Sequence, residues 1–88
     1  MTDQHYKFVY TRQAVEDIAK LDIVVKKRIK KALERFGENP LYFAKRLLNS
    51  QLGNYRFRIG DYRLPFDLDG QEITILRVGH RREIYRTK

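Results

Sequence analysis

The chain has 88 residues, which is enough for one small domain with a single modest core. Its 19 Lys and Arg against 11 Asp and Glu give a net charge of +8, which favours an anionic partner over an inert basic surface. There is no cysteine and there are only two histidines, so we expect no disulfide, no metal and no cofactor. No signal-peptide segment and no membrane-spanning run is present, which predicts a soluble, cytoplasmic protein that makes no use of a membrane.

The first half of the chain predicts one strand and two helices. Residues 5–10 alternate Tyr and Phe with other side chains, at the period of two that is typical of a strand. Thr11 is the expected N-cap of a short helix, and Asp22 the N-cap of a longer helix that stops at Gly37. The apolar residues of the short helix are Ala14, Val15, Ile18 and Leu21, and those of the long helix are Val25, Ile29, Ala32, Leu33 and Phe36.

The outer face of the longer helix is strongly basic. It carries one acid, Glu34, among five cations: Lys26, Lys27, Lys30, Lys31 and Arg35. Such a row can follow a phosphate backbone or meet an acidic partner, and the alternative is a solvated helix face. We select Lys27, Lys30 and Lys31 as candidate RNA-binding residues.

The next segment predicts a connector and then a strand. Asn39-Pro40 breaks the helical pattern, and residues 41–53 have no clean period, although we expect Leu47, Leu48 and Leu52 to pack under the sheet. From residue 54 the period of two returns. It turns Tyr55, Phe57 and Ile59 to one face and Arg56 and Arg58 to the other.

Two hairpin turns organise the rest of the chain. Gly60-Asp61 leads into a strand with Tyr62, Leu64, Phe66 and Leu68 inward and Arg63 outward. Asp69-Gly70 leads into residues 72–78, which are apolar on both faces as in a central strand. Pro65 is unexpected within a strand, because proline usually occurs at an edge or a bulge. The predicted order is β-α-α-β-β-β, an α+β fold.

These features resemble the RelE/ParE superfamily of bacterial and archaeal toxin–antitoxin modules, and within it the RelE-type ribosome-dependent mRNA endonucleases. The resemblance covers nearly the whole chain. It depends on the two helices before Asn39-Pro40, the motif from Tyr55 to Arg63, the Asp69-Gly70 hairpin and the motif from Val78 to Tyr85. It implies one RelE-like domain, residues 1–88, with a mainly antiparallel sheet, two helices packed on one face and an RNA-binding concavity on the other.

The resemblance also implies a set of site residues. RelE-like enzymes carry two basic residues on the strand after the connector, an arginine on the next strand, and an arginine and a tyrosine near the C-terminus. The matching residues here are Arg56, Arg58, Arg63, Arg81 and Tyr85. The chain departs from the pattern because Arg56 and Arg58 stand where the best-known relatives have lysines, and His80 occupies a position that is often basic. Arginine keeps the charge but does not shuttle a proton, which leaves that chemistry to Tyr85, His80 or Arg81.

Cleavage of RNA by its own 2′-hydroxyl needs a base, cations on the phosphorane oxygens and an acid at the departing 5′-oxygen. We assign Tyr85 as the base and Arg81 as the group that acts at the leaving oxygen. Stabilisation of the phosphorane is assigned to Arg56, Arg58 and Arg63. A tyrosine with a reference pKa of about 10 needs help from arginines, whereas His80 at about 6.5 needs less and is the alternate acid or base. Arg82 and Arg86 are expected to contact ribosomal RNA or to be solvated.

The implied function is that of a toxin that cleaves translated mRNA in the ribosomal A site. Its implied partners are the ribosome, the mRNA and a cognate antitoxin, expected to be an acidic and partly disordered chain. One alternative is a ParE-like inhibitor that binds DNA gyrase without nuclease chemistry, and another is a sequence-independent RNA-binding module. The density of arginines and the terminal Gly-His-Arg motif favour the nuclease.

Overall fold

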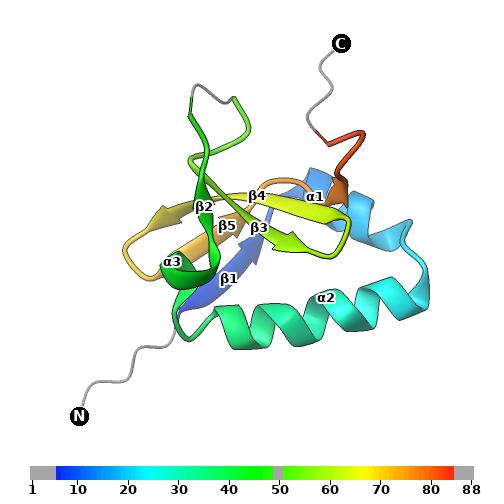
Figure 1. Cartoon of the computed structure of the whole chain (residues 1–88), viewed down its shortest axis with the longest axis horizontal. Helices are drawn as coiled ribbons and strands as arrows, with labels where there is room; N and C mark the ends of the chain where they lie inside the picture. The colour runs from blue at the N-terminus through cyan, green and yellow to red at the C-terminus, as the bar shows by residue number, and fades with distance from the viewer. Residues whose placement is uncertain (1–5, 49–50, 85–88) are drawn as a thin grey trace.

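The computed structural model describes residues 6–48 and 51–84. In chain order the elements are β1 (Lys7–Tyr10), α1 (Arg12–Ala19), α2 (Ile23–Phe36), α3 (Pro40–Phe43), β2 (Lys45–Arg46), β3 (Tyr55–Ile59), β4 (Tyr62–Asp69), β5 (Glu72–Ile75) and β6 (Gly79–His80) (Figure 1). The expected α+β class is confirmed. The predicted order lacked α3, β2 and β6, which are only four, two and two residues long, too short for a hydrophobic period to reveal. None of the helices in the described part of the chain is long and apolar enough to cross a membrane.

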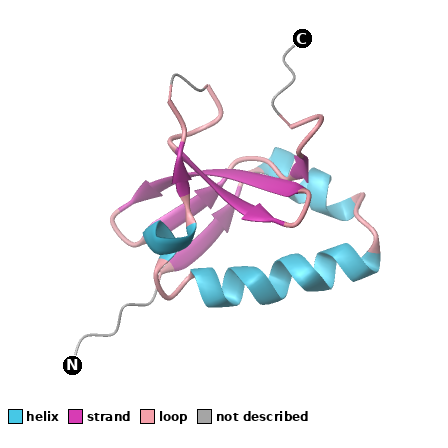
Figure 2. Cartoon of the chain, in the orientation of Figure 1, coloured by secondary structure: helices cyan, strands magenta, loops and turns pink. Residues whose placement is uncertain are grey.

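The sheet has the strand order β1-β5-β4-β3-β2, with β6 beside β4. The β1–β5 pairing is parallel and the other pairings are antiparallel, so the sheet is mainly antiparallel as expected. The segment predicted as a central strand over residues 72–78 is central, between β1 and β4, but its strand ends at Ile75. Figure 2 shows the long helix α2 running beside this sheet.

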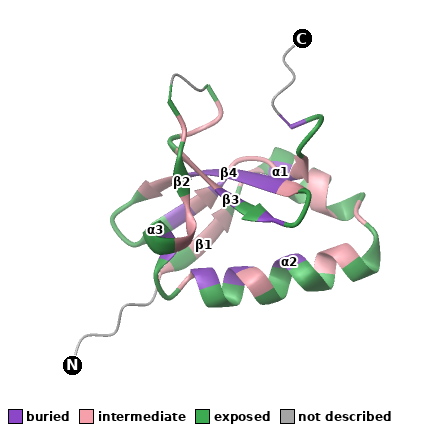
Figure 3. Cartoon of the chain, in the orientation of Figure 1, coloured by how far each residue is buried: buried purple, intermediate pink, exposed green. Residues whose placement is uncertain are grey.

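The core lies between the helices and one face of the sheet. Phe36 of α2 packs on Phe57 of β3, with ring centroids 4.8 Å apart, and Phe57 packs on Phe66 of β4 at 4.2 Å. Ile73 and Ile75 of β5 complete the buried sheet face, and the same cluster includes Ala14, Ile29 and Leu33 from the helices (Figure 3). Fully burying a side chain of this kind contributes about 1.5–3 kcal/mol, so the aromatic stack holds α2 against the sheet.

The caps at the helix ends follow the sequence. Thr11 is the N-cap of α1, since its Oγ1 accepts from the Ala14 N–H at 3.1 Å and donates to the Leu76 carbonyl at 2.9 Å. Asp22 is the N-cap of α2 without a hydrogen bond from its side chain. Gly37 ends α2 as expected, in a right-handed conformation. A Cβ there would lie 3.0 Å from Cε2 of Phe8, so close packing accounts for this glycine.

Three local predictions were wrong. Val15 is 54% exposed, because α1 has only eight residues and buries the narrow stripe around Ala14. Leu48 is 78% exposed and does not pack under the sheet. The second hairpin turns at Gly70-Gln71, one residue later than predicted, because Asp69 still pairs with Glu72 and Gly70 takes the positive φ of 61°.

Pro65 lies within β4, which is an interior strand. Its carbonyl accepts from the Leu76 N–H at 2.9 Å, and in an extended strand the N and O atoms of one residue point to the same side. That side is the gap where the chain has left β5 and not yet begun β6, since β5 pairs with Phe66–Asp69 and β6 with Tyr62 and Arg63. The missing proline donor therefore removes no ladder hydrogen bond.

Candidate functional site

The β3–β4 hairpin carries a row of arginines on the sheet face that points away from the helices. Arg56 and Arg58 alternate with the buried Phe57 and Ile59, and Arg58 lies directly opposite Arg63 in the register. Residues directly opposite one another share a face, with Cβ atoms about 4.5–5.5 Å apart. The structure thus brings three of the sequence-predicted site residues onto one face.

Lys45 joins this face from β2. It lies directly opposite Arg56 in the antiparallel β2–β3 pair and its side chain is exposed. Lys45 was not among the sequence-predicted site residues, because a two-residue strand leaves no periodic signal in the connector. We call Lys45, Arg56, Arg58 and Arg63 the outer arginine face.

Arg63 differs from its neighbours because it is buried. We expected it to point outward with Arg56 and Arg58, yet only 8% of the residue is exposed. Its Nη1 donates to the carbonyl oxygens of Gly60 at 2.9 Å and Tyr62 at 3.1 Å. These bonds tie the guanidinium to the β3–β4 turn, so Arg63 fixes the shape of the turn while adding positive charge to the face.

Arg81 contacts the same β3–β4 turn from the segment that follows β6. Strand β6 pairs with β4 and places Gly79 opposite Arg63, and the next turn brings the Arg81 N–H to the Asp61 carbonyl at 2.7 Å. The Arg81 Nε also lies 3.8 Å from Asp61 Oδ1, and both side chains are at least half exposed. Exposed ion pairs of this kind are weak, so the Arg81 guanidinium remains available to a phosphate.

His80 lies on the opposite face. It pairs with Tyr62, whose ring packs against the core, and the two rings meet edge to face with centroids 5.7 Å apart. With Lys20 and Leu21 it lines a pocket against α1, and its Nδ1 accepts from the Arg82 N–H at 3.2 Å. The structure therefore separates His80 from the outer arginine face.

The segment that leads to Arg81 is anchored to α1 by Asp17. The Asp17 carboxylate accepts from Arg77 Nε at 2.8 Å, from Arg77 Nη2 at 3.3 Å and from the Val78 N–H at 3.0 Å. Partial burial alone raises the pKa of Asp17, but the hydrogen bonds from Arg77 and Val78 outweigh it and hold the pKa below its usual value. Arg77 was not among the sequence-predicted site residues, because its contact with Asp17 joins α1 to the residues after β5, 60 positions apart in sequence.

The cations of α2 divide between two flanks of the helix. Lys26 and Lys30 lie with Glu34 beside β1, whereas Lys31 lies with Arg28 and Arg35 beside β3. Of the predicted RNA-binding residues, Lys30 and Lys31 therefore point to different grooves, and Lys27 and Arg82 are exposed. Tyr85 and Arg86 lie outside the described residues.

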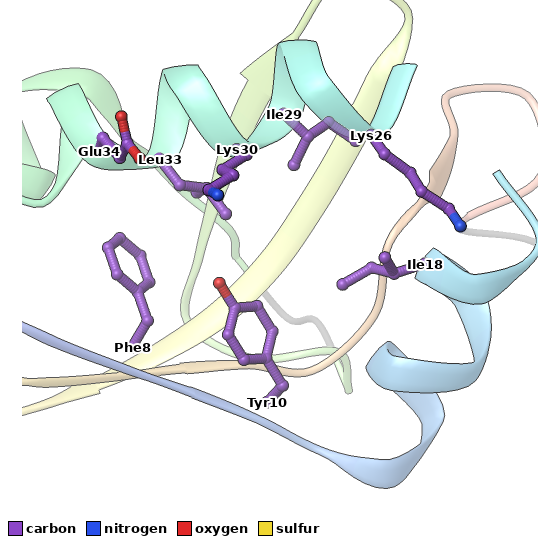
Figure 4. A pocket seen from close by; sticks show the side chains of 8 residues that line it. All are labelled: Phe8, Tyr10, Ile18, Lys26, Ile29, Lys30, Leu33 and Glu34. Atoms are coloured by element: carbon purple, nitrogen blue, oxygen red, sulfur yellow. The ribbon is translucent and has the colours of Figure 1, made fainter. Parts of the chain in front are cut away.

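The flank beside β1 holds an apolar groove of about 440 Å³ (Figure 4). Phe8 and Tyr10 of β1 face Ile29 and Leu33 of α2 across it, and Lys26, Lys30 and Glu34 lie along its rim. Burial in this groove raises the pKa of the Tyr10 phenol. Elsewhere, no three histidine or carboxylate side chains of residues 6–48 and 51–84 gather closely enough to hold a metal ion.

The sequence and the fold are both similar to those of known proteins. The family model described as ParE toxin of type II toxin-antitoxin system, parDE, matches residues 8–85. Toxin RelE3 of Methanocaldococcus jannaschii is 29% identical over 83 residues, covering 90% of this chain and 94% of its own length.

Two solved structures agree with these matches. The toxin–antitoxin complex RelBE2 from Mycobacterium tuberculosis contains a chain with a TM-score of 0.78 and 30% identity, covering 88% of this chain and 99% of that chain. The RelB-RelE antitoxin–toxin complex from Methanococcus jannaschii contains a chain with a TM-score of 0.71 and 27% identity, covering 91% of this chain and 98% of that chain. The chain therefore belongs to the RelE/ParE superfamily and is a toxin of a type II toxin–antitoxin module.

Proposed function

We propose that this toxin is a ribosome-dependent endoribonuclease that cleaves translated mRNA in the A site. The observation that carries the proposal is the outer arginine face, where Arg56 and Arg58 project from β3, together with Arg81 beside the β3–β4 turn. Guanidinium groups bind phosphate oxygens through two parallel hydrogen bonds and stay protonated at any physiological pH. The RelE names of the similar proteins support the same activity.

The proposed reaction is a transesterification within the RNA. The 2′-oxygen attacks the adjacent phosphorus, the bond from phosphorus to the 5′-oxygen breaks, and the products are a 2′,3′-cyclic phosphate and a 5′-hydroxyl. A base takes the 2′-hydroxyl proton and an acid returns one to the 5′-oxygen. Arg56 and Arg58 stabilise the charge that develops on the phosphorane, and Arg81 acts at the leaving oxygen.

The other predicted site residues, Arg63, His80 and Tyr85, differ in the role that the proposed reaction gives them. Arg63 is a positioning residue, because its guanidinium is bonded to the β3–β4 turn, which follows the strand of Arg58 and accepts a hydrogen bond from the Arg81 N–H. His80 is not assigned a role in the reaction, because it lies on the helix side of the sheet. Tyr85 as the base follows from the family resemblance alone, and its position is outside the described residues.

The test is controlled expression of the toxin with and without its antitoxin, followed by mapping of mRNA 5′ ends and cleavage on purified ribosomes. We expect growth arrest, breaks inside translated codons and no cleavage when the scissile nucleotide carries a 2′-deoxy sugar. Cleavage of the deoxy substrate would contradict the proposed chemistry. Intact mRNA with DNA damage or blocked replication would instead support the gyrase inhibitor, the second candidate, which the match to the ParE toxin family model favours.

We also propose that the antitoxin occupies the apolar groove beside β1. The ladder to β5 uses the N–H groups of Lys7 and Thr11, so the backbone groups of Phe8 and Tyr10 point to the open edge of the sheet. An apolar segment with flanking acidic residues would fill the groove and meet Lys26 and Lys30 at its rim. The structural similarity to chains from toxin–antitoxin complexes supports such a partner.

A further inference from the structure

A second groove, on the other flank of α2, is lined by cations. Arg28, Lys31 and Arg35 of α2 face Arg58 of β3 across a volume of about 610 Å³, and the rest of the lining is Ala32, Phe36, Ile59 and Gly60. No carboxylate is among these described lining residues, in contrast to the apolar groove, whose rim includes Glu34. We call this feature the cationic groove.

The cationic groove is open because β3 has a free edge there. Strand β2 pairs only with Tyr55 and Arg56, so within residues 6–48 and 51–84 no strand lies beside Phe57–Ile59 on that side. The contact between Phe36 and Phe57 fixes the C-terminal part of α2 at this edge. The helix and the strand edge therefore form the two walls.

Arg35 is held in place by aromatic contacts that leave its charge intact. The Arg35 guanidinium carbon lies 5.4 Å from the ring centroid of Phe36 and 5.5 Å from that of Phe43. Arg28 Nη1 lies 3.6 Å from the position that a Cβ on Gly60 would take, next to the β3–β4 turn. Among the described residues, no carboxylate forms an ion pair with Arg28, Lys31 or Arg35. Holding the Arg35 guanidinium in advance lowers the entropic cost of binding an anion there.

We propose that the cationic groove binds consecutive phosphates of an RNA backbone, as an extension of the site on the outer arginine face. Arg28 and Arg35 are seven residues apart, about 10.5 Å along the helix axis, which suits a polyanion better than a single small anion. Arg58 belongs both to the groove and to the outer arginine face, so one strand can pass from one to the other. The inference rests on the proposed nuclease function and adds a second contact surface to it.

The test compares two double variants that remove the same charge, one inside the cationic groove and one outside it. Arg28→Gln with Arg35→Gln removes two cations from the cationic groove. Lys7→Gln with Lys20→Gln, at two exposed positions that do not line this groove, is the matched control. Binding of each full-length protein to a single-stranded RNA and to ribosomes carrying mRNA is measured by fluorescence anisotropy between 50 and 300 mM salt. Equal thermal unfolding of the three proteins establishes that the variants are folded.

The groove variant should bind RNA more weakly, and its slope of log K against log salt should be smaller in magnitude by about 1.4, or about 0.7 for each lost phosphate contact. The control should keep nearly the wild-type slope. A change on free RNA and on ribosomes identifies the messenger strand as the occupant, and a change on ribosomes alone identifies ribosomal RNA. Either result supports the proposal that the cationic groove binds an RNA backbone.

Other outcomes overturn the proposal. Equal slopes for the two variants would show that net charge alone matters, and weakened antitoxin binding with unchanged RNA binding would assign the groove to a protein partner. If the wild type cleaves mRNA on ribosomes while the groove variant binds RNA like the wild type, the proposed role of the cationic groove is wrong and the proposed nuclease function is retained. If the wild type neither cleaves nor binds RNA, both proposals fail.

Discussion

The two faces of the β3–β4 hairpin differ sharply in the chemistry of their side chains. The face toward the helices consists of fully buried apolar side chains such as Phe57, Leu64 and Phe66. The other face carries Arg56 and Arg58, which alternate with Tyr55, Phe57 and Ile59 along the five-residue strand β3. Because successive side chains of a strand point to opposite faces, the residues that form the core and those of the proposed phosphate site are separate and one position apart. Substitutions on the two faces should therefore have separable effects.

The largest expected effect is on the inner face. Phe57→Ala removes the ring that packs between Phe36 and Phe66, and truncating a buried phenylalanine costs about 3–5 kcal/mol. Urea unfolding followed by circular dichroism should show a loss of this size, a large part of the stability of a small domain. A loss below about 1 kcal/mol would contradict the central place given to this stack.

The next effect is on the outer face and concerns activity. Arg56→Gln with Arg58→Gln should lower cleavage of mRNA on ribosomes by about 10²–10³-fold, the usual cost of removing a group that stabilises transition-state charge. The same variant should change the free energy of unfolding by less than about 0.5 kcal/mol, since these side chains project away from the core. Lys7→Gln with Lys20→Gln, both exposed, provides a control of equal charge. An unfolded double variant, or one that cleaves like the control, would break the separation of the two faces.

A smaller effect is expected at the clamp that joins α1, through Asp17, to the segment that leads to Arg81. Asp17→Asn should destabilise the protein by about 1–2 kcal/mol, less than a fully buried charged hydrogen bond because Arg77 is partly exposed. The pKa of Asp17 is lowered in the folded state, so its stabilisation is present above the unfolded pKa of about 3.9 and is lost as the pH falls through the folded value.

The measurement is the free energy of unfolding of the wild type and the Asp17→Asn variant between pH 2 and pH 7. The difference between them should be constant near neutral pH and shrink in acid. Arg12, on the outer side of the same helix in an exposed pair with Glu16, offers a control in Arg12→Gln, which should change little. A difference that grows in acid would contradict the direction given for the pKa of Asp17.

Most of the fold was predictable from local patterns, whereas contacts between distant elements were not. The alternation at Tyr55–Ile59 and the helical spacing at Ile29, Leu33 and Phe36 gave the correct faces, because burial on one side imposes that periodicity. The burial of Arg63 was missed, since alternation assigns a face but says nothing of side-chain bonds to turn carbonyls.

The same limit applies to the candidate site. Strand pairing brings Lys45 to the site, and the packing of α2 beside β3 brings Arg28 and Arg35 there. Neither contact can be predicted from the local sequence pattern. His80 shows the converse problem, because two adjacent residues of a motif, Gly79 and His80, point to opposite faces of β6. A motif read as one cluster therefore mixes residues from both sides of the sheet.

The smallest expected effect is at His80, and it tests the comparison of the two faces most sharply. A general acid or base contributes about 10²–10⁴-fold to a rate, so His80→Gln would lose that much if the imidazole acted on the scissile phosphate. Since the ring lies against Tyr62 on the helix side, we expect cleavage on ribosomes to remain close to the wild-type rate. Arg81→Gln, one residue further along, is the matched comparison and should be strongly impaired, because Arg81 stands beside the β3–β4 turn. If His80→Gln were the more damaging of the two, the catalytic groups would have to reach the RNA from the helix side of the sheet, and the outer arginine face would be reduced to binding.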